Sequence, residues 1–375
     1  MTSEVFDVVV IGGGLHGLSA GLHLARQGAR VIVLERAWTG RHASGATAAG
    51  VRTLGRDLEE LPISLEAMRM WHDIEALVGD DCGFSPSGHL KVAETPEEFR
   101  KLEEGVANLN RLGYCHEIMI GQGELRRIVP ALAHHCVGAS YSPDNGAADP
   151  HRTLLAFRTA AERAGVTIHQ RSGVDAITPS ARGWTVGAGG ASYSSAAVVN
   201  AAGAWGGRIA RLVGDEFPLG TRASMMTVSE RVAPFLTPTV GAVSTKGSFK
   251  QTARGTVLIG GGFQGGQDLD AETTPTQFAN LAQMARNLIK LFPAMRDVKI
   301  VRTWGGLEGL TKDRLPYICP SPSVEGVFHV FGFSGHGFQL APVVGAIVAD
   351  LVLRGQTLRD IKHFNPRRFA RTAAA

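Results

Sequence analysis

The chain has 375 residues, of which 44% are hydrophobic and 19% are charged, as is typical of a soluble globular protein long enough for two domains. Its net charge of +4 is not concentrated in any stretch, so we expect no nucleic-acid surface. Four cysteines without C-x-x-C spacing argue against a disulfide framework and a cysteine metal site, and favour a reducing, cytoplasmic location.

The first predicted unit, over residues 8–36, is a strand, a glycine-rich turn, a helix and a second strand. Gly12, Gly14 and Gly17 form a G-x-G-x-x-G motif. The first glycine permits the tight turn, the second lets the backbone approach a pyrophosphate, and the third lets the helix pack against the strand. Glu35 follows the second strand, where an acidic side chain binds ribose hydroxyls. The combination predicts dinucleotide binding, since a glycine turn in another α/β unit would not need the acid.

Later elements are predicted from apolar periodicity, capping boxes and glycine or proline stops. We expect helices over residues 62–78, 95–112, 123–129, 149–164, 274–291 and 338–353, and strands over residues 88–93, 137–141, 166–168, 174–177, 183–186, 196–200, 225–228, 248–251, 257–260, 298–304 and 327–331. The glycine-rich segment 40–50 can lie against a large planar ligand, with a flexible loop as the alternative. A second glycine-rich turn, 332–337, precedes the last helix, whose N-terminal dipole favours negative charge on a ligand.

Two further classes of site are excluded by the pattern. The four histidines between residues 116 and 151 share no ligand-like spacing, so we expect no metal. The last helix contains Pro342 and Asp350 and is too short and too interrupted to cross a bilayer of about 30 Å. We therefore expect no integral membrane segment.

Four blocks make the pattern specific: VVVIGGGLHGLSAGLHLARQGARVIVLER, SGATAAGVR, VVNAAGAWGG, and TKDRLPYI followed by GFSGHGFQLAP. With these blocks the sequence resembles the D-amino acid oxidase superfamily of FAD enzymes. It is most similar to the branch of glycine oxidase, the sarcosine oxidase β subunit and D-hydroxyproline dehydrogenase. The blocks extend from Val8 to Pro342, so the resemblance covers nearly the whole chain.

The resemblance implies an α/β fold with two interleaved domains. One is a Rossmann-like FAD-binding domain of the glutathione-reductase type, assembled from residues 1–86, 149–216 and 312–375. The other is an α+β substrate-binding domain on a largely antiparallel sheet, formed by residues 87–148 and 217–311.

The resemblance also implies where FAD binds. The adenosine is expected at Gly12, Gly14, Glu35 and Arg36, and the isoalloxazine ring at residues 335–339. The full expected set is Gly12, Gly14, Leu15, His16, Gly17, Glu35, Arg36, Ser44, Gly45, Ala46, Ala49, Gly50, Val174, Ala202, Gly203, Trp205, Gly332, Gly335, His336, Gly337, Phe338 and Gln339. Relatives with covalent FAD carry a cysteine in the segment that corresponds to residues 301–310; this chain has none there, so we expect non-covalent FAD.

The chain departs from its relatives at the residues that bind the substrate carboxylate. Glu308 replaces the arginine of glycine oxidase, and Gln339 replaces a lysine of the monomeric sarcosine oxidases. Arg52 and Arg302 are the remaining candidates, with ordinary surface ion pairs as the alternative. Lys250 is a further candidate, either near the flavin or solvent-exposed.

Glu308 therefore predicts a preference for a cationic or hydrogen-bond-donating group on the substrate, because a substrate carboxylate there would meet like charge. The alternative is that Glu308 turns to solvent or pairs with Arg302 or Lys312.

The expected reaction is oxidation of the C–N bond of a small amine, imino acid or amino acid by hydride transfer to flavin N5, followed by hydrolysis of the imine. No side chain is assigned a catalytic role, and His336 is given no part in proton transfer. Oxygen or an electron-accepting partner would take the electrons. The alternative is a flavin subunit of a heteromeric dehydrogenase that passes electrons to a partner subunit or carrier; a binding protein that uses FAD structurally is a third reading.

Overall fold

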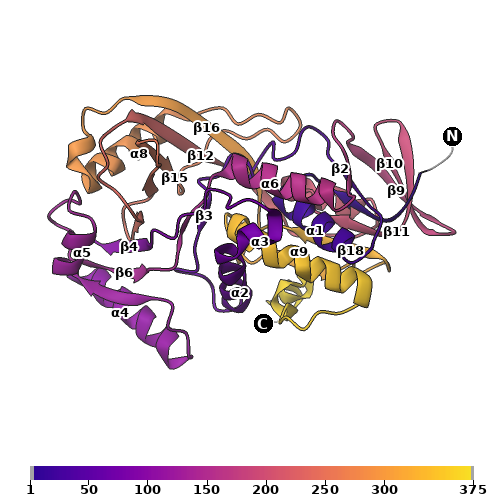
Figure 1. The fold of residues 1–375 in the computed structure, drawn as a ribbon, viewed down its shortest axis with the longest axis horizontal. Helices are drawn as coiled ribbons and strands as arrows, with labels where there is room; N and C mark the ends of the chain where they lie inside the picture. Colours follow the sequence, from indigo (N-terminus) through magenta and orange to yellow (C-terminus); the bar gives the residue numbers. More distant parts are fainter. Residues whose placement is uncertain (1–3, 373–375) are drawn as a thin grey trace.

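The structure is a computed structural model that describes residues 4–372, and two large sheets lie side by side in it (Figure 1). The first sheet has the order β17-β18-β11-β1-β2-β8, and β10 and β9 extend it from β11. Its strands are β1 (Glu4–Ile11), β2 (Val31–Leu34), β8 (Thr167–His169), β9 (Val174–Ser180), β10 (Gly183–Ala188), β11 (Ala191–Asn200), β17 (Tyr317–Pro320) and β18 (Val327–Phe331). The pairs from β18 through β11, β1 and β2 to β8 are parallel. Apolar runs such as residues 8–11 suit such strands, which are buried on both faces.

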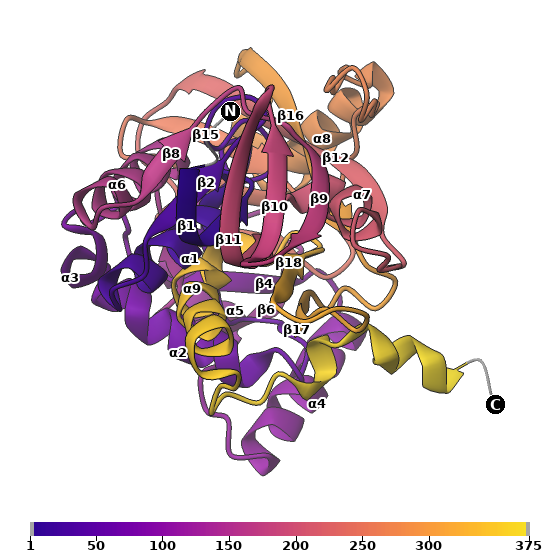
Figure 2. The ribbon, with the colours of Figure 1, turned by 90° about the vertical axis from the view of Figure 1, so that its right-hand side faces the viewer.

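Different layers cover the two faces of this sheet. Val8 and Val10 belong to a core shared with α1 and α9, whereas Val9 and Ile11 belong to a second core with Trp184 of β10. This alternation follows from the two-residue period of a strand. The helices of this part are α1 (Leu15–Arg26), α2 (Leu61–His72), α3 (Ile74–Val78), α6 (Pro150–Arg163), α7 (Gly206–Arg211) and α9 (Gly337–Arg354), with 3₁₀ turns η1 (Gly203–Trp205), η3 (Lys362–Phe364) and η4 (Pro366–Thr372). Figure 2 shows α9 alongside α1.

The second sheet has the order β16-β12-β15-β14-β13-β4-β6-β5 and is antiparallel except between β13 and β4. Its strands are β4 (His89–Ala93), β5 (Ile118–Gly121), β6 (Gly138–Ser142), β12 (Gly220–Arg231), β13 (Thr239–Ala242), β14 (Ser248–Gln251), β15 (Thr256–Gly260) and β16 (Ile300–Leu310). Its helical elements are α4 (Pro96–Arg111), α5 (Gln122–Ile128), α8 (Phe278–Leu291) and η2 (Pro293–Met295). Phe249 of β14 and Met284 of α8 belong to the core of this half.

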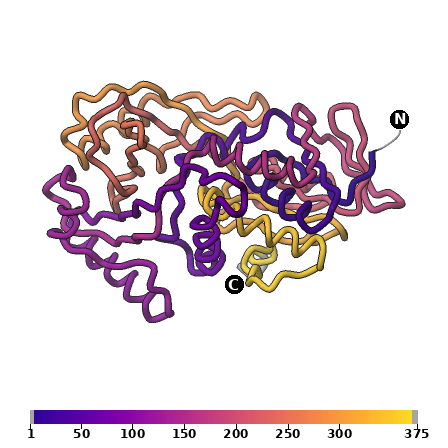
Figure 3. Tube along the Cα trace, in the orientation of Figure 1, coloured from indigo at the N-terminus to yellow at the C-terminus, as the bar shows by residue number. Residues whose placement is uncertain are grey.

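Distant stretches of the chain assemble each sheet (Figure 3). The first sheet takes its strands from residues 4–34, 167–200 and 317–331, and the second from residues 89–142 and 220–310. A short ladder of β3 (Gly50–Val51) and β7 (Gly146–Ala147) forms a third sheet. The strands of the first sheet fall inside the segments predicted for the FAD-binding domain, and those of the second sheet fall inside the segments predicted for the substrate-binding domain. The domain boundaries themselves stay predictions.

α9 is, among the described residues, the one helix long and apolar enough to cross a membrane by length and composition alone. Most of it is buried, and residues such as Leu340 and Val344 belong to the main core. It is packed as the core helix of a globular fold.

Two predicted helix bounds are wrong. The helix predicted over 62–78 is two helices, because the backbone leaves helical geometry at Asp73 (φ −106°, ψ 23°). The helix predicted from Thr274 begins at Phe278, because the Thr274 hydroxyl donates to the Gly305 carbonyl (3.1 Å). The box at Thr95 is confirmed: its hydroxyl accepts a hydrogen bond from the Glu98 N–H (3.2 Å).

Candidate active site

A single cavity of about 820 Å³ is lined by residues from both large sheets. Its walls come from the start of α1, the segment 40–50, the end of β11, strands β12, β14, β15 and β16, and the turn 332–337. A volume of this size suits a large organic ligand. The glycine-rich segments predicted to approach a ligand therefore converge on one space.

One end of the cavity is built around Glu35, which follows β2. The Glu35 carboxylate accepts hydrogen bonds from the Gly13 N–H (2.7 Å) and the Ala37 N–H (2.8 Å), and burial raises its pKa. Arg36 pairs with Glu272 (2.6 Å) and lies over the Trp205 ring at 4.6 Å. An acidic group fixed by backbone donors, followed by an arginine that lies over an aromatic ring, fits the adenosine of a dinucleotide.

The first glycine turn is sterically closed to larger residues. Gly12 has φ +108°, and a Cβ there would lie 2.5 Å from the Ala201 carbonyl oxygen. A Cβ on Gly17 would lie 1.9 Å from the Gly12 carbonyl oxygen, so this glycine sets the packing of α1 on β1. The Ser44 hydroxyl accepts from the Leu15 N–H (3.0 Å) at the start of α1. The backbone can thus approach a pyrophosphate here.

The second glycine turn leads into α9, as predicted, and His336 occupies its N-cap position. Beside this turn, the His16 ring stacks on Phe333 with 3.7 Å between centroids. Both ring nitrogens of His16 are buried, the backbone of Gly337 is their polar neighbour, and burial lowers the pKa of His16 to about 3. His16 and Phe333 line the cavity together with the two glycine turns, and this lining fits the dinucleotide implied by the sequence.

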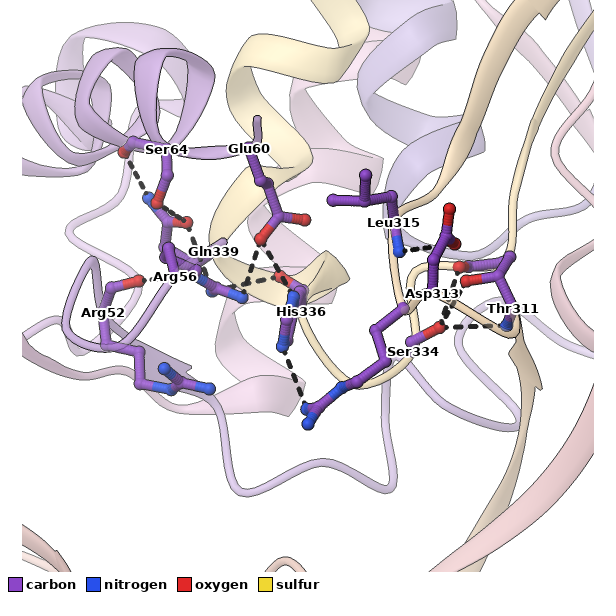
Figure 4. A network of polar contacts seen from close by, with 12 residues as sticks. Arg52, Arg56, Glu60, Ser64, Thr311, Asp313, Leu315, Ser334, His336 and Gln339 are labelled. Carbon is purple, nitrogen blue, oxygen red and sulfur yellow. Dashed lines mark hydrogen bonds and ion pairs between the residues drawn. The ribbon is translucent and has the colours of Figure 1, made fainter. Parts of the chain in front are cut away.

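The far end of the cavity holds a cluster of charged side chains (Figure 4). Glu60 is fully buried, and its Oε2 accepts from the Arg56 guanidinium (3.3 Å) and from His336 Nδ1 (2.9 Å). His336 Nε2 lies 3.3 Å from Arg314 Nη2. Arg52, which bonds the Leu54 carbonyl, has its pKa lowered to about 9 by burial and by Arg56. The cluster contains more cationic than anionic side chains.

Glu308 faces the same cavity, but it has a partner. Its Oε1 accepts from Arg222 Nε (2.7 Å) and from the Ser224 hydroxyl (2.5 Å). Arg222 stands directly opposite Glu308 in the antiparallel pair of β12 and β16. Neither partner expected from the sequence, Arg302 or Lys312, is the one the structure shows.

The structure does not bring six of the predicted residues to the cavity wall: Gly17, Gly45, Ala49, Lys250, Arg302 and Gln339. Arg302 is exposed near the outer end of β16, over Trp304. The Lys250 ammonium donates to the Ala148 carbonyl (3.2 Å), and burial lowers its pKa to about 8. Gln339 is buried behind the wall, where it exchanges hydrogen bonds with Ser64. Their direct contact with a ligand is not supported by these positions.

The other predicted residues line the cavity, and its wall also contains charged side chains that the sequence did not indicate, among them Arg56, His89, Arg222 and Arg314. Arg314 stands inside the TKDRLPYI block, and Arg222 could have been found by pairing β12 with β16. Nothing local in the sequence distinguishes His89. Within residues 4–372, no group of three or more His, Cys, Asp or Glu side chains could hold a metal.

Comparison with known proteins agrees with this geometry. A family model described as DAO, FAD dependent oxidoreductase, matches residues 7–351. The chain is 28% identical over 371 residues to glycine oxidase of Geobacillus kaustophilus, with 96% of each chain covered. It is 26% identical over 360 residues to sarcosine oxidase subunit beta of Rhodobacter capsulatus, covering 93% of this chain and 85% of that protein.

Among solved structures, L-proline dehydrogenase from P. horikoshii superposes with a TM-score of 0.91 at 26% identity, and the match covers 99% of both chains. The paired sheets and the interleaved order of segments are therefore shared with this group. Since the family model matches most of its length, the chain belongs to the D-amino acid oxidase superfamily of FAD-dependent oxidoreductases, in the branch of glycine oxidase and the sarcosine oxidase β subunit.

Proposed function

We propose that this enzyme oxidises the C–N bond of an amino acid or imino acid that carries a carboxylate. One observation supports this most: Arg52 and Arg314 line the cavity beside the turn 332–337, and neither forms an ion pair within residues 4–372. A guanidinium that faces a ligand cavity without a carboxylate of its own is suited to bind one from the ligand. FAD, when bound, takes up the hydride from the carbon that carries the nitrogen.

The remaining charges support the same substrate class. The Arg222–Glu308 pair carries no net charge, so Glu308 does not by itself require a cationic substrate. Glu60 forms an ion pair with Arg56, whereas Arg52 and Arg314 form none within residues 4–372. This proposal replaces the preference for basic substrates expected from Glu308 alone.

Matched pairs of compounds test the proposal. Proline against pyrrolidine, and N-methylglycine against dimethylamine, differ only in the carboxylate. Under anaerobic conditions, the amino acid of each pair should bleach the flavin absorbance at a rate at least 100-fold higher, and both enantiomers of proline should be tried. Equal or faster bleaching by the amines would contradict the proposal.

A second candidate is a flavin subunit that passes electrons to a partner, which is supported by the similarity to a protein named as a β subunit. The chain purified alone would then reduce a dye acceptor while producing little peroxide. We also propose that FAD is non-covalent, because none of the described cysteines lines the cavity. Acid precipitation should release all of the FAD, and flavin that stays with the pellet would contradict this.

A further inference from the structure

His336 is held by a hydrogen bond to Glu60 on one ring nitrogen and by Arg314 on the other (Figure 4). Arg314 can only donate, so His336 Nε2 is the acceptor of that hydrogen bond. His336 Nδ1 therefore carries the proton and donates to the Glu60 carboxylate (2.9 Å). These partners fix both the orientation and the tautomer of the ring. The His336 ring lines the cavity, and Nε2 is the ring nitrogen that carries the lone pair.

The environment keeps this ring neutral while no ligand is present. Burial, then the charge of Arg56, lowers the pKa of His336 to about 3, and Glu60 only partly opposes this. Although burial alone would raise it, the pKa of Glu60 is lowered by Arg56 and His336, so Glu60 is a carboxylate. Arg52 and Arg314 add two more positive charges on the cavity side.

Several other charged or titratable groups lie nearby, among them Glu117, whose charge acts on Arg52. His16 and His89 are neutral, because burial lowers the pKa of each to about 3. Beyond Gly335, Arg222 and Glu308 neutralise each other. Asp57, a partly buried carboxyl whose pKa is raised, interacts with Arg314 from the side of the loop before α2.

We propose that His336 Nε2 is the proton acceptor for the substrate ammonium group, and that the substrate carboxylate exposes it by drawing Arg314 away. This inference rests on the proposed function. The carboxylate would pair with Arg314 and Arg52, neutralise the charges that oppose protonation, and leave the lone pair of His336 Nε2 free. Binding of the correct substrate would thus raise the proton affinity of His336 when the base is needed.

The proton and electron balance is simple. An N–H bond of the substrate ammonium breaks, and its proton goes to His336 Nε2, forming an imidazolium that remains paired with Glu60. The nitrogen lone pair would then form the C=N bond, and FAD, when bound, would accept the C–H electron pair as hydride. Water hydrolyses the imine, and the imidazolium returns its proton to solvent. Glu60 is a positioning residue that also stabilises the imidazolium, as a buried carboxylate does in other His-dependent sites.

A binding experiment tests this without turnover. Propionate has the carboxylate but no amine, and calorimetry in two buffers of different ionisation enthalpy counts the protons taken up when it binds. Between pH 6 and 8, the wild-type holoenzyme should take up protons, most strongly at the acid end. His336→Asn should bind propionate without uptake, and the exposed His151→Asn serves as the matched control. Absence of uptake in the wild type, or uptake that persists in His336→Asn, would overturn the proposal.

Anaerobic flavin reduction gives the second readout. At pH 7, His336→Asn should lower the reduction rate with a carboxylate-bearing ammonium substrate by about 100-fold or more. The rate should then rise tenfold per pH unit toward the pKa of the substrate amine. Glu60→Gln, which keeps the shape of the side chain, should give a smaller loss with the same change of profile. A variant with the wild-type pH profile would overturn the proposal.

The two experiments separate this inference from the proposed function. If Arg52→Met and Arg314→Gln leave propionate affinity unchanged, the carboxylate site itself is wrong. If those variants lose affinity while the proton uptake does not depend on His336, only the inference about His336 fails.

Discussion

The two ends of the cavity are built in different ways. At the nucleotide end, backbone groups and glycines form most of the site. Gly12, Gly17 and Glu35 lie within one short unit of the chain. At the substrate end, charged side chains meet from distant segments: Glu60 and His336 are 276 residues apart. The first end is specified by local spacing, whereas the second depends on how the two sheets are placed.

Adding one methyl group at Gly17 should have the largest effect on the nucleotide end of the cavity. In Gly17→Ala, the Cβ would lie 1.9 Å from the Gly12 carbonyl oxygen, so α1 would have to move off β1. Overpacking of this kind costs about 3 kcal/mol or more when backbone blocks relaxation. We expect loss of FAD from the purified protein and a strongly lowered Tm, both measured by absorbance.

Gly21→Ala is the matched control in the same helix. Its Cβ would meet Val33 Cγ2 at 3.4 Å, an ordinary contact. If both variants retain FAD, the close contact between Gly17 of α1 and the Gly12 carbonyl is not needed for FAD binding.

At the substrate end, removing one positive charge should weaken substrate binding while FAD stays bound. Arg52→Met should lower kcat/KM for carboxylate-bearing substrates, because the substrate carboxylate would be left unpaired in a buried site. The loss corresponds to about 2–4 kcal/mol of activation free energy. Arg314→Gln should act in the same direction. Steady-state kinetics measure the effect, and the flavin spectrum reports whether the cofactor site is intact.

Arg254→Gln, in the exposed turn between β14 and β15, provides the control. If Arg52→Met and this control have equal kcat/KM, the carboxylate binds elsewhere.

This contrast explains what could be predicted from the sequence. The β1–α1–β2 unit, the second glycine turn and α9 follow from spacing that a single segment carries. Arg314 and Arg222 were missed because their partners, His336 and Glu308, are 22 and 86 residues away. Arg302 was a candidate only because the usual carboxylate partners are absent from the sequence, and β16 carries it to an exposed position. A side chain that acts through tertiary contacts leaves little local signal.

A third region, the buried contact between β18 and the loop before β12, tests how separate segments of the predicted FAD-binding domain are joined. Asp215 Oδ2 accepts from His329 Nε2 (2.8 Å) and the Ser321 hydroxyl (2.5 Å). Against the effect of burial, these donors lower the pKa of Asp215. A depressed folded-state pKa gives stability that is complete above the unfolded value, near 3.8, and is lost as the pH falls through the folded value.

Asp215→Asn should therefore lower the free energy of unfolding by about 1–3 kcal/mol at pH 7. The difference from the wild type should shrink below about pH 4, where the wild-type carboxylate also becomes protonated. Urea unfolding at pH 7 and at pH 3 measures this. A difference that stays constant between the two pH values would mean that the charge of Asp215 is not involved.

The smallest expected effect concerns the Arg222–Glu308 pair. Because the two side chains neutralise each other in the cavity wall, the two single variants should act in opposite directions. Glu308→Gln frees the Arg222 charge and should increase affinity for carboxylate-bearing substrates, by about 1–2 kcal/mol. Arg222→Met leaves the Glu308 carboxylate unpaired and should decrease the affinity by a similar amount. The double variant should lie near the wild type, since the net charge is restored. Dissociation constants from flavin difference spectra with propionate measure all three. Changes of the same sign in the two single variants would show that the pair only supports the fold of β12 and β16. Opposite signs would show that Glu308 tunes carboxylate binding at the substrate end, through the arginine beside it.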